Sequence, residues 1–446
     1  MSHYKETIRL GVPIMLGQLG IIVVNFADNI MVGHHNTQEL AAASFVNNFF
    51  NLAFIFGMGF SYGLTPIIGR LFAQGNREEA GATLKNSLVI NLVIGILLSL
   101  CMLFLLLNID WLDQPKELYP YIRPYYILQL FSVIFAMLFN AFKQFSDGTT
   151  DTLTPMYIML SANIINIIGN YFLIYGHGGF PEMGLTGAGI STLFSRILTF
   201  ALFFLLFLKR KKYAAYLKGF RSASVSKEKI ASLTRLGLPV GFQMGVETAS
   251  FSLSVIMMGW IGSMALAAYQ VAGVITTLGF MLYYGIGAAV SIRVSNFHGS
   301  HNLREIRRAV KAGFLIMLCS MSLFIIFLLL FRTQIGYLFT PEPDVVHLVA
   351  IFCWPMMLYQ FGDALQILFA NALRGLTDVH YMAKMALVCH FGLALPIGYL
   401  CGFVLEWGAL GVWCGFPVSL TTLGVLLWRR FDRLTQERKC HSAIIQ

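Results

Sequence analysis

The chain has 446 residues, of which 57% are hydrophobic and only 12% are charged. Because a soluble domain carries about 25% charged residues, this composition excludes an ordinary soluble protein and indicates an integral membrane protein. The net charge is +10, but the basic residues are scattered through short loops, which argues against a nucleic-acid-binding surface. The seven cysteines lie mostly in apolar runs and form no CxxC pair, so they predict neither a disulfide framework nor a metal site.

Apolar runs of about 20 to 26 residues recur along the whole chain, and a helix of this length crosses about 30 Å of hydrocarbon. The sequence predicts twelve such spans, at residues 8–32, 44–67, 83–108, 120–143, 153–175, 184–208, 234–259, 268–292, 307–331, 346–371, 380–403 and 407–428. The first run is too long for the apolar core of a signal peptide, and eleven further runs follow it. We therefore predict an all-α integral membrane protein with twelve transmembrane helices.

The second half of the chain repeats the first. Residues 9–13 read RLGVP and residues 235–239 read RLGLP, an offset of 226 (235 − 9) that also relates LAA at 40–42 to LAA at 266–268. A duplicated half predicts two six-helix bundles related by an internal repeat. The predicted divisions are an N-terminal lobe at 1–208, a basic cytoplasmic linker at 209–233, a C-terminal lobe at 234–430 and a cytoplasmic tail at 431–446.

Lys and Arg residues are concentrated in the loops that follow even-numbered spans and near the two termini, whereas the loops after odd-numbered spans carry almost none. Because basic loops remain on the cytoplasmic side, both termini and the central linker are predicted to face the cytoplasm. The predicted location is the cell (inner) membrane, which the chain crosses many times.

Two carboxyl groups of the second half lie near the middle of predicted spans. Glu247 lies one helical turn after Gln243, while Tyr359, Asp363 and Gln366 share one face of the tenth span. A carboxylate at this depth costs about 2.5–3.5 kcal/mol unless it is paired, protonated or in contact with water. Such acids either hold helices together or bind a cation or proton. We favour the second interpretation, because burial helps protons compete for a carboxylate and the neighbouring oxygens suit a small cation.

The first half carries one comparable acid, Asp28, toward the outer end of the first span. The fifth span presents Asn163, Asn166 and Asn170 on one face, and Thr192 lies in the sixth. Asparagine side chains within a membrane can simply join helices. Their occurrence in the same half as an intramembrane acid favours a second polar chamber.

The acids are not part of the repeat. At the offset of 226, Asp28 aligns with Ser254; near the tenth span the offset is 231, and Asp363 aligns with Ser132. Each half has therefore acquired its own polar residues. Gln360, beside Tyr359 in the tenth span, is included in the predicted polar network.

Several other residues are weaker candidates. The sequence does not identify partners for Arg196 and His390, and structural pairing is the favoured interpretation of both. His34 and His35 lie in an outer loop without a third ligand, so no metal is predicted there. Phe280 belongs to a group of aromatic and methionine side chains suited to line a cavity for flat organic cations.

The two repeats, each opening with RLG-[VL]-P and continuing to D-x-x-M-V-G or its counterpart and to L-A-A, resemble the multidrug and toxic compound extrusion (MATE) transporters over nearly the whole chain. The acid of the seventh span and the Y-x-x-x-D pattern of the tenth resemble the NorM branch. The resemblance implies a cation-coupling region, with sodium as a possible ligand, formed by Glu247, Asp363 and Tyr359. It also implies an N-terminal polar network formed by Asp28, Asn166, Asn170 and Thr192.

In function, the resemblance implies a transporter and not an enzyme: an antiporter that exports amphipathic organic cations in exchange for sodium ions or protons by alternating access. No cofactor other than the coupling ion is expected, and the expected partners are small cationic substrates and the lipid bilayer, with the chain acting as a monomer. The alternative is an exporter or flippase of lipid-linked saccharides or another endogenous metabolite. Carboxyl groups at the membrane midplane favour the antiporter.

Overall fold

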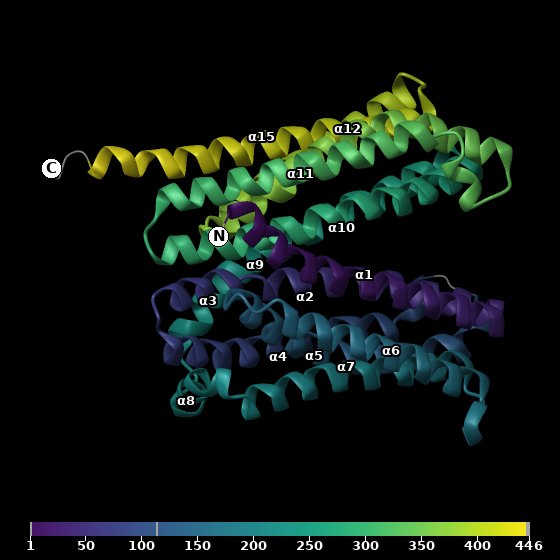
Figure 1. Cartoon of the computed structure of the whole chain (residues 1–446). Coiled ribbons are helices and arrows are strands. Elements are labelled where there is room, and N and C mark those ends of the chain that lie inside the picture. Colours follow the sequence, from purple (N-terminus) through teal and green to yellow (C-terminus); the bar gives the residue numbers. More distant parts are fainter. Residues whose placement is uncertain (1, 113–114, 443–446) are drawn as a thin grey trace. The chain divides into compact units, whose positions relative to one another are not determined.

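The structure, a computed structural model, describes residues 2–112 and 115–442, and regular structure within these residues is helical, without strands (Figure 1). The first half contains α1 (His3–His35), α2 (Thr37–Ser61), α3 (Leu64–Ala73), α4 (Arg77–Leu107), α5 (Tyr119–Gly148), α6 (Leu153–Tyr175), α7 (Gly184–Lys209) and α8 (Ala214–Ser222). The second half contains α9 (Lys227–Ile261), α10 (Ser263–Gly299), α11 (Leu303–Phe331), α12 (Pro343–Gly375), α13 (Val379–Cys389), α14 (Leu395–Tyr399) and α15 (Gly408–Ser442). Short 3-10 or π-helical segments are η1 (Ile109–Leu112), η2 (Lys116–Leu118), η3 (His177–Gly179), η4 (Lys211–Tyr213), η5 (Ile335–Leu338), η6 (His390–Ala394) and η7 (Leu400–Val404).

Twelve helical stretches in the described part of the chain are long and apolar enough to cross a membrane, which confirms the predicted all-α membrane fold. Some helices extend past their predicted spans, because the predicted spans contain only the apolar residues and the helices begin at polar capping residues outside them. Asn76 caps α4 by accepting a hydrogen bond from the Glu79 amide at 3.3 Å, and Asn302 caps α11 by accepting one from the Glu305 amide at 3.2 Å. The two caps are 226 residues apart (302 − 76), so the repeat extends to the ends of the helices.

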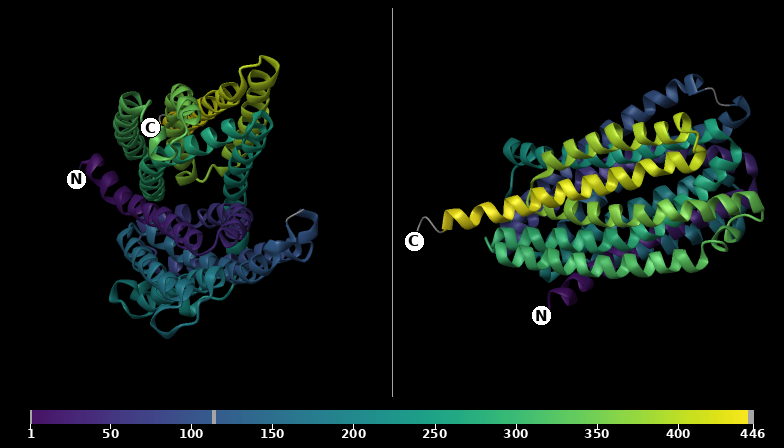
Figure 2. Two further views of the ribbon diagram at one scale, coloured as in Figure 1. Left: turned by 90° about the vertical axis from the view of Figure 1, so that its right-hand side faces the viewer. Right: turned by 90° about the horizontal axis from the view of Figure 1, so that it is seen from above.

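The helices form two compact units. The N-terminal unit comprises Leu16–Gly241, and the C-terminal unit comprises Met1–Met15 together with Phe242–Gln446. The long helices of each unit run roughly along one common direction (Figure 2). The predicted lobes at 1–208 and 234–430 differ from these units, because the first half of α1 packs with the C-terminal unit and the first half of α9 packs with the N-terminal unit.

The exchanged segments are the RLG-[VL]-P repeats, and glycines explain how closely they pack. A Cβ atom on Gly11 would lie 3.0 Å from the Gly285 carbonyl oxygen, within the C-terminal unit. Within the N-terminal unit, a Cβ atom on Gly237 would lie 2.5 Å from the Phe60 carbonyl oxygen. Only glycine permits such close backbone contact. Gly11 and Gly237 are related by the repeat offset of 226, and each allows close contact between helices in its unit.

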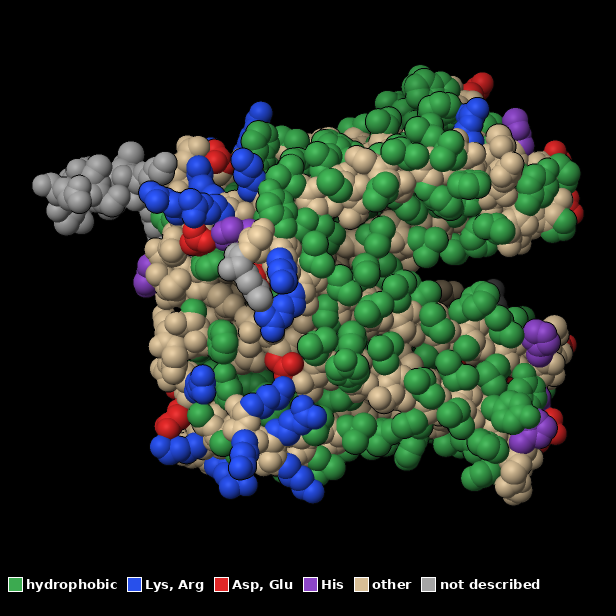
Figure 3. Space-filling view, in the orientation of Figure 1, with side chains coloured by type: hydrophobic (Ala, Val, Ile, Leu, Met, Phe, Trp, Pro, Cys, Tyr) green, Lys and Arg blue, Asp and Glu red, His purple; other side chains and the backbone are tan. Residues whose placement is uncertain are grey.

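Each unit has its own apolar core. In the C-terminal unit the core includes the buried side chains of Phe352, Trp413 and Phe416. In the N-terminal unit one cluster contains Tyr126 and another contains Phe142. On the face shown in Figure 3, hydrophobic side chains cover the middle of each unit, while Lys and Arg side chains gather mostly at one end. This distribution is typical of a membrane protein; the cytoplasmic location of the basic end stays a prediction.

The predicted basic linker at 209–233 contains η4, α8 and the start of α9 and is folded against the N-terminal unit. Lys212 forms an ion pair with Asp151, and the Tyr213 hydroxyl donates to the same carboxylate at 2.9 Å. Burial alone would raise the pKa of Asp151, but the hydrogen bonds from Lys212 and Thr154 hold this pKa below its ordinary value. The linker is therefore attached through a charged contact.

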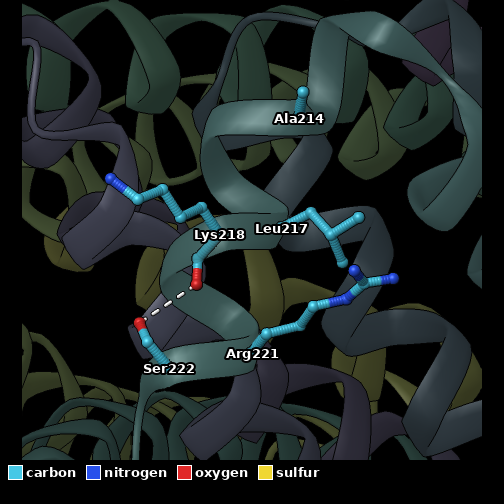
Figure 4. Close-up of a pocket in the computed structure, with 5 residues that line it drawn as sticks. All are labelled: Ala214, Leu217, Lys218, Arg221 and Ser222. Atoms are coloured by element: carbon cyan, nitrogen blue, oxygen red, sulfur yellow. Dashed lines mark hydrogen bonds between the residues drawn. The ribbon is translucent and has the colours of Figure 1, made fainter.

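A hollow of about 500 Å³ lies beside α8 and is lined by Ala214, Leu217, Lys218, Arg221 and Ser222 (Figure 4). The Ser222 hydroxyl donates to the Lys218 carbonyl oxygen at 3.0 Å, and the Lys218 ammonium forms an ion pair with Glu78 at 2.7 Å. The first contact lies within α8, and the ion pair attaches α8 to α4. None of the residues predicted to bind an ion or a substrate lines this hollow.

Candidate functional site

The two predicted acids of the C-terminal unit come from different helices. Glu247 lies on α9, where its carboxylate accepts hydrogen bonds from the side-chain amides of Gln243 at 3.1 Å and of Gln366 at 3.2 Å. Asp363 lies on α12, one turn before Gln366, and is 1% exposed. The two carboxyl groups are close enough for their charges to repel each other. The structure therefore brings the two acids together, with Gln366 of α12 bonded to the acid of α9.

Asp363 is a buried carboxyl group beside a second acid. Its Oδ2 atom has no hydrogen-bond partner among the described residues. The Arg374 guanidinium of the same helix is near enough to attract the carboxylate of Glu247. Buried polar atoms in proteins are nearly always hydrogen-bonded, so an oxygen of this kind calls for an explanation. A bound cation or a proton on the carboxyl group would provide one.

Further unpaired oxygens lie on the neighbouring glutamines. Gln243 Oε1 and Gln366 Oε1 have no partner among the described residues, although both residues donate to Glu247. Carboxylate and amide oxygens are the ligands preferred by small hard cations, so these residues fit such an ion. The described residues contain no group of three or more His, Cys, Asp and Glu side chains arranged for a metal ion. A cation here would therefore need amide or hydroxyl oxygens beside the two carboxyl groups.

Tyr359 and Gln360 precede Asp363 on α12 and are both buried. The Tyr359 ring packs between Phe251 and Trp413, with centroid distances of 6.3 and 5.8 Å. Gln360 lies against Gly279 of α10, and neither polar atom of its side chain has a partner among the described residues. The polar face predicted for the tenth span is therefore buried inside the C-terminal unit.

The three predicted residues Asp28, Asn166 and Asn170 meet in the N-terminal unit. The Asn170 amide donates to Asp28 Oδ1 at 2.5 Å. The side-chain amide of Asn166 is oriented so that its nitrogen and its oxygen each form a hydrogen bond. The nitrogen donates to Asp28 Oδ1 at 3.1 Å, and the oxygen accepts from the Thr192 backbone amide at 3.2 Å. The Ser191 hydroxyl donates to the backbone carbonyl oxygen of Asn166 at 2.8 Å. Asp28 of α1 is thus bonded to α6 and linked through Asn166 to α7.

Two predicted residues are not joined to these clusters. Asn163 packs against Gly20, where a Cβ atom would lie 2.7 Å from its Nδ2, and this nitrogen has no partner among the described residues. The centroid of the Phe280 ring lies 5.7 Å from that of Tyr284 on the same helix, and the two rings are tilted by 36°. The prediction that Phe280 lines a substrate cavity remains untested.

The structure identifies partners for Arg196 and His390, which the sequence could not provide. The Arg196 guanidinium donates to Ser132 and Gln129 of α5, and His390 Nδ1 lies 3.3 Å from the Ser250 hydroxyl of α9. His390 is fully buried where α13 gives way to the π-helical η6. A local widening of this kind is frequent at functional sites.

Residues 13–172 and 239–400 match the family model described as MatE. The two matched segments fall one in each half, as the repeat requires, and together cover most of the chain. The chain belongs to the MatE family.

Among its MATE relatives, the chain is 30% identical to the multidrug resistance protein PmpM of Pseudomonas aeruginosa, over 97% of this chain and 92% of that protein. It is 28% identical to the multidrug resistance protein NorM of Photobacterium profundum, over 96% of each. These similarities confirm the resemblance to the NorM branch. The crystal structure of the eukaryotic MATE transporter AtDTX14 shares the fold, with a TM-score of 0.86 at 20% identity over 98% of each chain.

Sequence reasoning missed several polar contacts of this MATE chain. The Tyr125 hydroxyl donates to Asn47 Oδ1 at 3.0 Å. This hydrogen bond joins α5 to α2 within the N-terminal unit. The ring nitrogens of His35 lie 2.9 Å from Glu39 and 2.8 Å from Glu182, whereas the sequence offered no further ligand near His34. Glu182 is 147 residues from His35, and no local pattern connects positions so far apart.

Proposed function

We propose that this MATE chain is a multidrug efflux antiporter that exports amphipathic organic cations and takes up sodium ions or protons in exchange. The observation that carries the proposal is the acid pair of Glu247 and Asp363. Glutamine amides donate to Glu247, and the Oδ2 atom of the buried Asp363 has no hydrogen-bond partner among the described residues. Relatives named as multidrug resistance proteins support the substrate class. The proposed location is the inner membrane, with both termini in the cytoplasm.

The proposed coupling requires a difference in affinity. The ion must bind one conformation of the protein more tightly than the other, because an ion that binds both equally shifts no equilibrium. Glu247 and Asp363 would take up the ion when they face the outside, and the bound ion would favour substrate release. Asp28, which accepts hydrogen bonds from Asn170 and Asn166, provides a second carboxylate in the other unit.

The proposal is tested first in cells. The chain, expressed in a bacterial host that lacks its own multidrug pumps, is expected to lower the steady-state accumulation of ethidium several-fold relative to the empty vector. Collapsing both the sodium and the proton gradients should restore accumulation, because the exchange has no other energy source. Equal ethidium accumulation with and without the chain, at matched membrane expression, would contradict the proposed function and favour an exporter of lipid-linked saccharides or another metabolite.

A further inference from the structure

The basic linker at 209–233 has a large excess of positive charge. It contains eight Lys and Arg residues and one acid, Glu228, so its net charge is +7 (8 − 1). Three of the bases form ion pairs with carboxylates of the N-terminal unit: Lys212 with Asp151, Lys218 with Glu78 and Lys229 with Glu79. The other five are exposed and have no ion-pair partner among the described residues: Lys209, Arg210, Lys211, Arg221 and Lys227. The attachment of the linker therefore uses fewer than half of its basic residues.

The unpaired bases begin directly at the end of a membrane-spanning helix. The last residue of α7 is Lys209, and the chain continues through Arg210 and η4 into α8. Leu205, one turn before Lys209 on α7, is an exposed apolar side chain, and the linker itself exposes Val225. Basic residues that follow a membrane helix directly lie at the level of the lipid headgroups. The linker is therefore placed where it can meet both headgroups and hydrocarbon.

α8 is held in one position by close contact with α4. A Cβ atom on Gly219 of α8 would lie 1.8 Å from the Glu78 carbonyl oxygen, and a Cβ atom on Gly81 of α4 would lie 1.8 Å from the Tyr216 carbonyl oxygen. Glycine at both positions lets the two backbones meet. The ion pair of Lys218 with Glu78 joins the same two helices. The buried face of α8 is thus fixed on α4, and its opposite face is presented outward.

The outward face of α8 contains the hollow of about 500 Å³ (Figure 4). Leu217 and Arg221 are one turn apart and extend to one side of the helix, whereas Lys218 extends to the other. No hydrogen bond or ion pair joins the Arg221 guanidinium to a described residue. A guanidinium carries five N–H donors in a planar fork that matches a phosphate group. The hollow therefore combines an available phosphate-binding group with an apolar side chain.

We propose that the hollow beside α8 binds the phosphate of an anionic phospholipid through Arg221. Arg210 and Lys211 precede the hollow, which begins at Ala214, and add to the positive charge that attracts this lipid. Clusters of about four to eight Lys and Arg residues next to a membrane helix are typical of surfaces that bind acidic lipids. The inference goes beyond the proposed function, because it concerns the surrounding membrane and not the transported substrate.

A lipid fits these observations better than a soluble phosphate compound. A soluble anion would need only the basic groups, whereas the exposed apolar side chains of Leu205 and Val225 suit a ligand that has hydrocarbon beside its charge. The acyl chains of a phospholipid remain in the bilayer while its headgroup reaches the linker. The same bases would also orient the chain in the membrane, but orientation requires only their presence and no hollow on a fixed helix.

The test measures the preference of the purified full chain for phosphatidylglycerol over phosphatidylcholine by native mass spectrometry in a neutral detergent. This method counts the lipid molecules on each protein and gives a dissociation constant for each lipid. The double variant Arg210→Gln, Arg221→Gln is expected to lower the preference about 25-fold, because each basic residue at a charged lipid surface contributes about fivefold to affinity. The matched control is Arg304→Gln, Arg433→Gln, which removes two exposed arginines of the C-terminal unit and should keep the wild-type preference.

Ala214→Glu provides a second test that removes no base. It places an acid in the hollow at the first residue of α8, where a negative charge favours the helix, and should lower the preference about fivefold. Thermal unfolding midpoints show whether each variant is folded. An unchanged preference in the folded linker variants, or an equal fall in the control, would overturn the inference. Displacement of phosphatidylglycerol by inorganic phosphate at a comparable concentration would also overturn it, because the hollow would then bind a free anion. None of these outcomes affects ethidium export, which tests the proposed function separately.

Discussion

Glu247→Gln and Asp363→Asn are each expected to abolish ion-coupled efflux, lowering it at least about tenfold. Each substitution keeps the size of the side chain and removes the group that binds the cation or the proton. A site that no longer distinguishes the ion-bound from the ion-free state cannot bias the conformational equilibrium. Folding should survive, because the two acids are near enough to repel each other and neutralising one relieves that repulsion.

The measurement is export of a fluorescent organic cation from cells or proteoliposomes with equal amounts of each variant. Asp344→Asn is the matched control, since Asp344 is an exposed acid in the first turn of the same helix, α12. It should export at the wild-type rate. Wild-type rates in Glu247→Gln and Asp363→Asn would show that the acid pair does not couple the ion, and the role proposed for the C-terminal unit would have to be abandoned.

Asp28→Asn is expected to have the second largest effect, a loss of transport of about tenfold. The carboxylate accepts hydrogen bonds from Asn170 and, through the reoriented amide, from Asn166. An asparagine at this position keeps one acceptor oxygen but loses the negative charge, so the attraction for a cationic substrate or ion disappears. Because hydrogen bonds to charged groups are worth about 1.5–3 kcal/mol, some loss of stability in the N-terminal unit is also expected.

Asn25→Ala is the control for this position, because Asn25 lies one turn before Asp28 on α1 and is exposed. Transport rates and thermal unfolding midpoints of both variants separate the two effects. Reduced transport with a nearly unchanged midpoint is the expected pattern for Asp28→Asn. A large fall in the midpoint, together with normal transport by the surviving protein, would assign Asp28 a structural role only.

The number of spans, the repeat and the acids could be predicted from the sequence because each is a local signal. The length of an apolar run is enough to predict a membrane helix, and an acid such as Asp363 is easily recognised within such a run. The spacing of Gln243 and Glu247 at one helical turn also identifies a contact that the structure contains, at 3.1 Å.

Contacts between distant parts of the chain could not be predicted in the same way. Gln366 is 119 residues from Glu247, and Arg196 is 67 residues from Gln129, so their contacts depend on which helix faces share an interface. The exchange of the first halves of α1 and α9 between the units was missed for a related reason. A continuous apolar helix carries no sequence signal at the point where its neighbours change, here between Met15 and Leu16.

Transport by the purified chain in proteoliposomes tests the central claim most directly. An inward sodium gradient at equal pH and an inward proton gradient without sodium are imposed separately, and the movement of ethidium against its own gradient is recorded. At least one of the two gradients should drive uphill export, and Asp363→Asn should stop it. If neither gradient moves ethidium, although the reconstituted protein is folded and correctly inserted, the chain is not a cation-coupled drug antiporter.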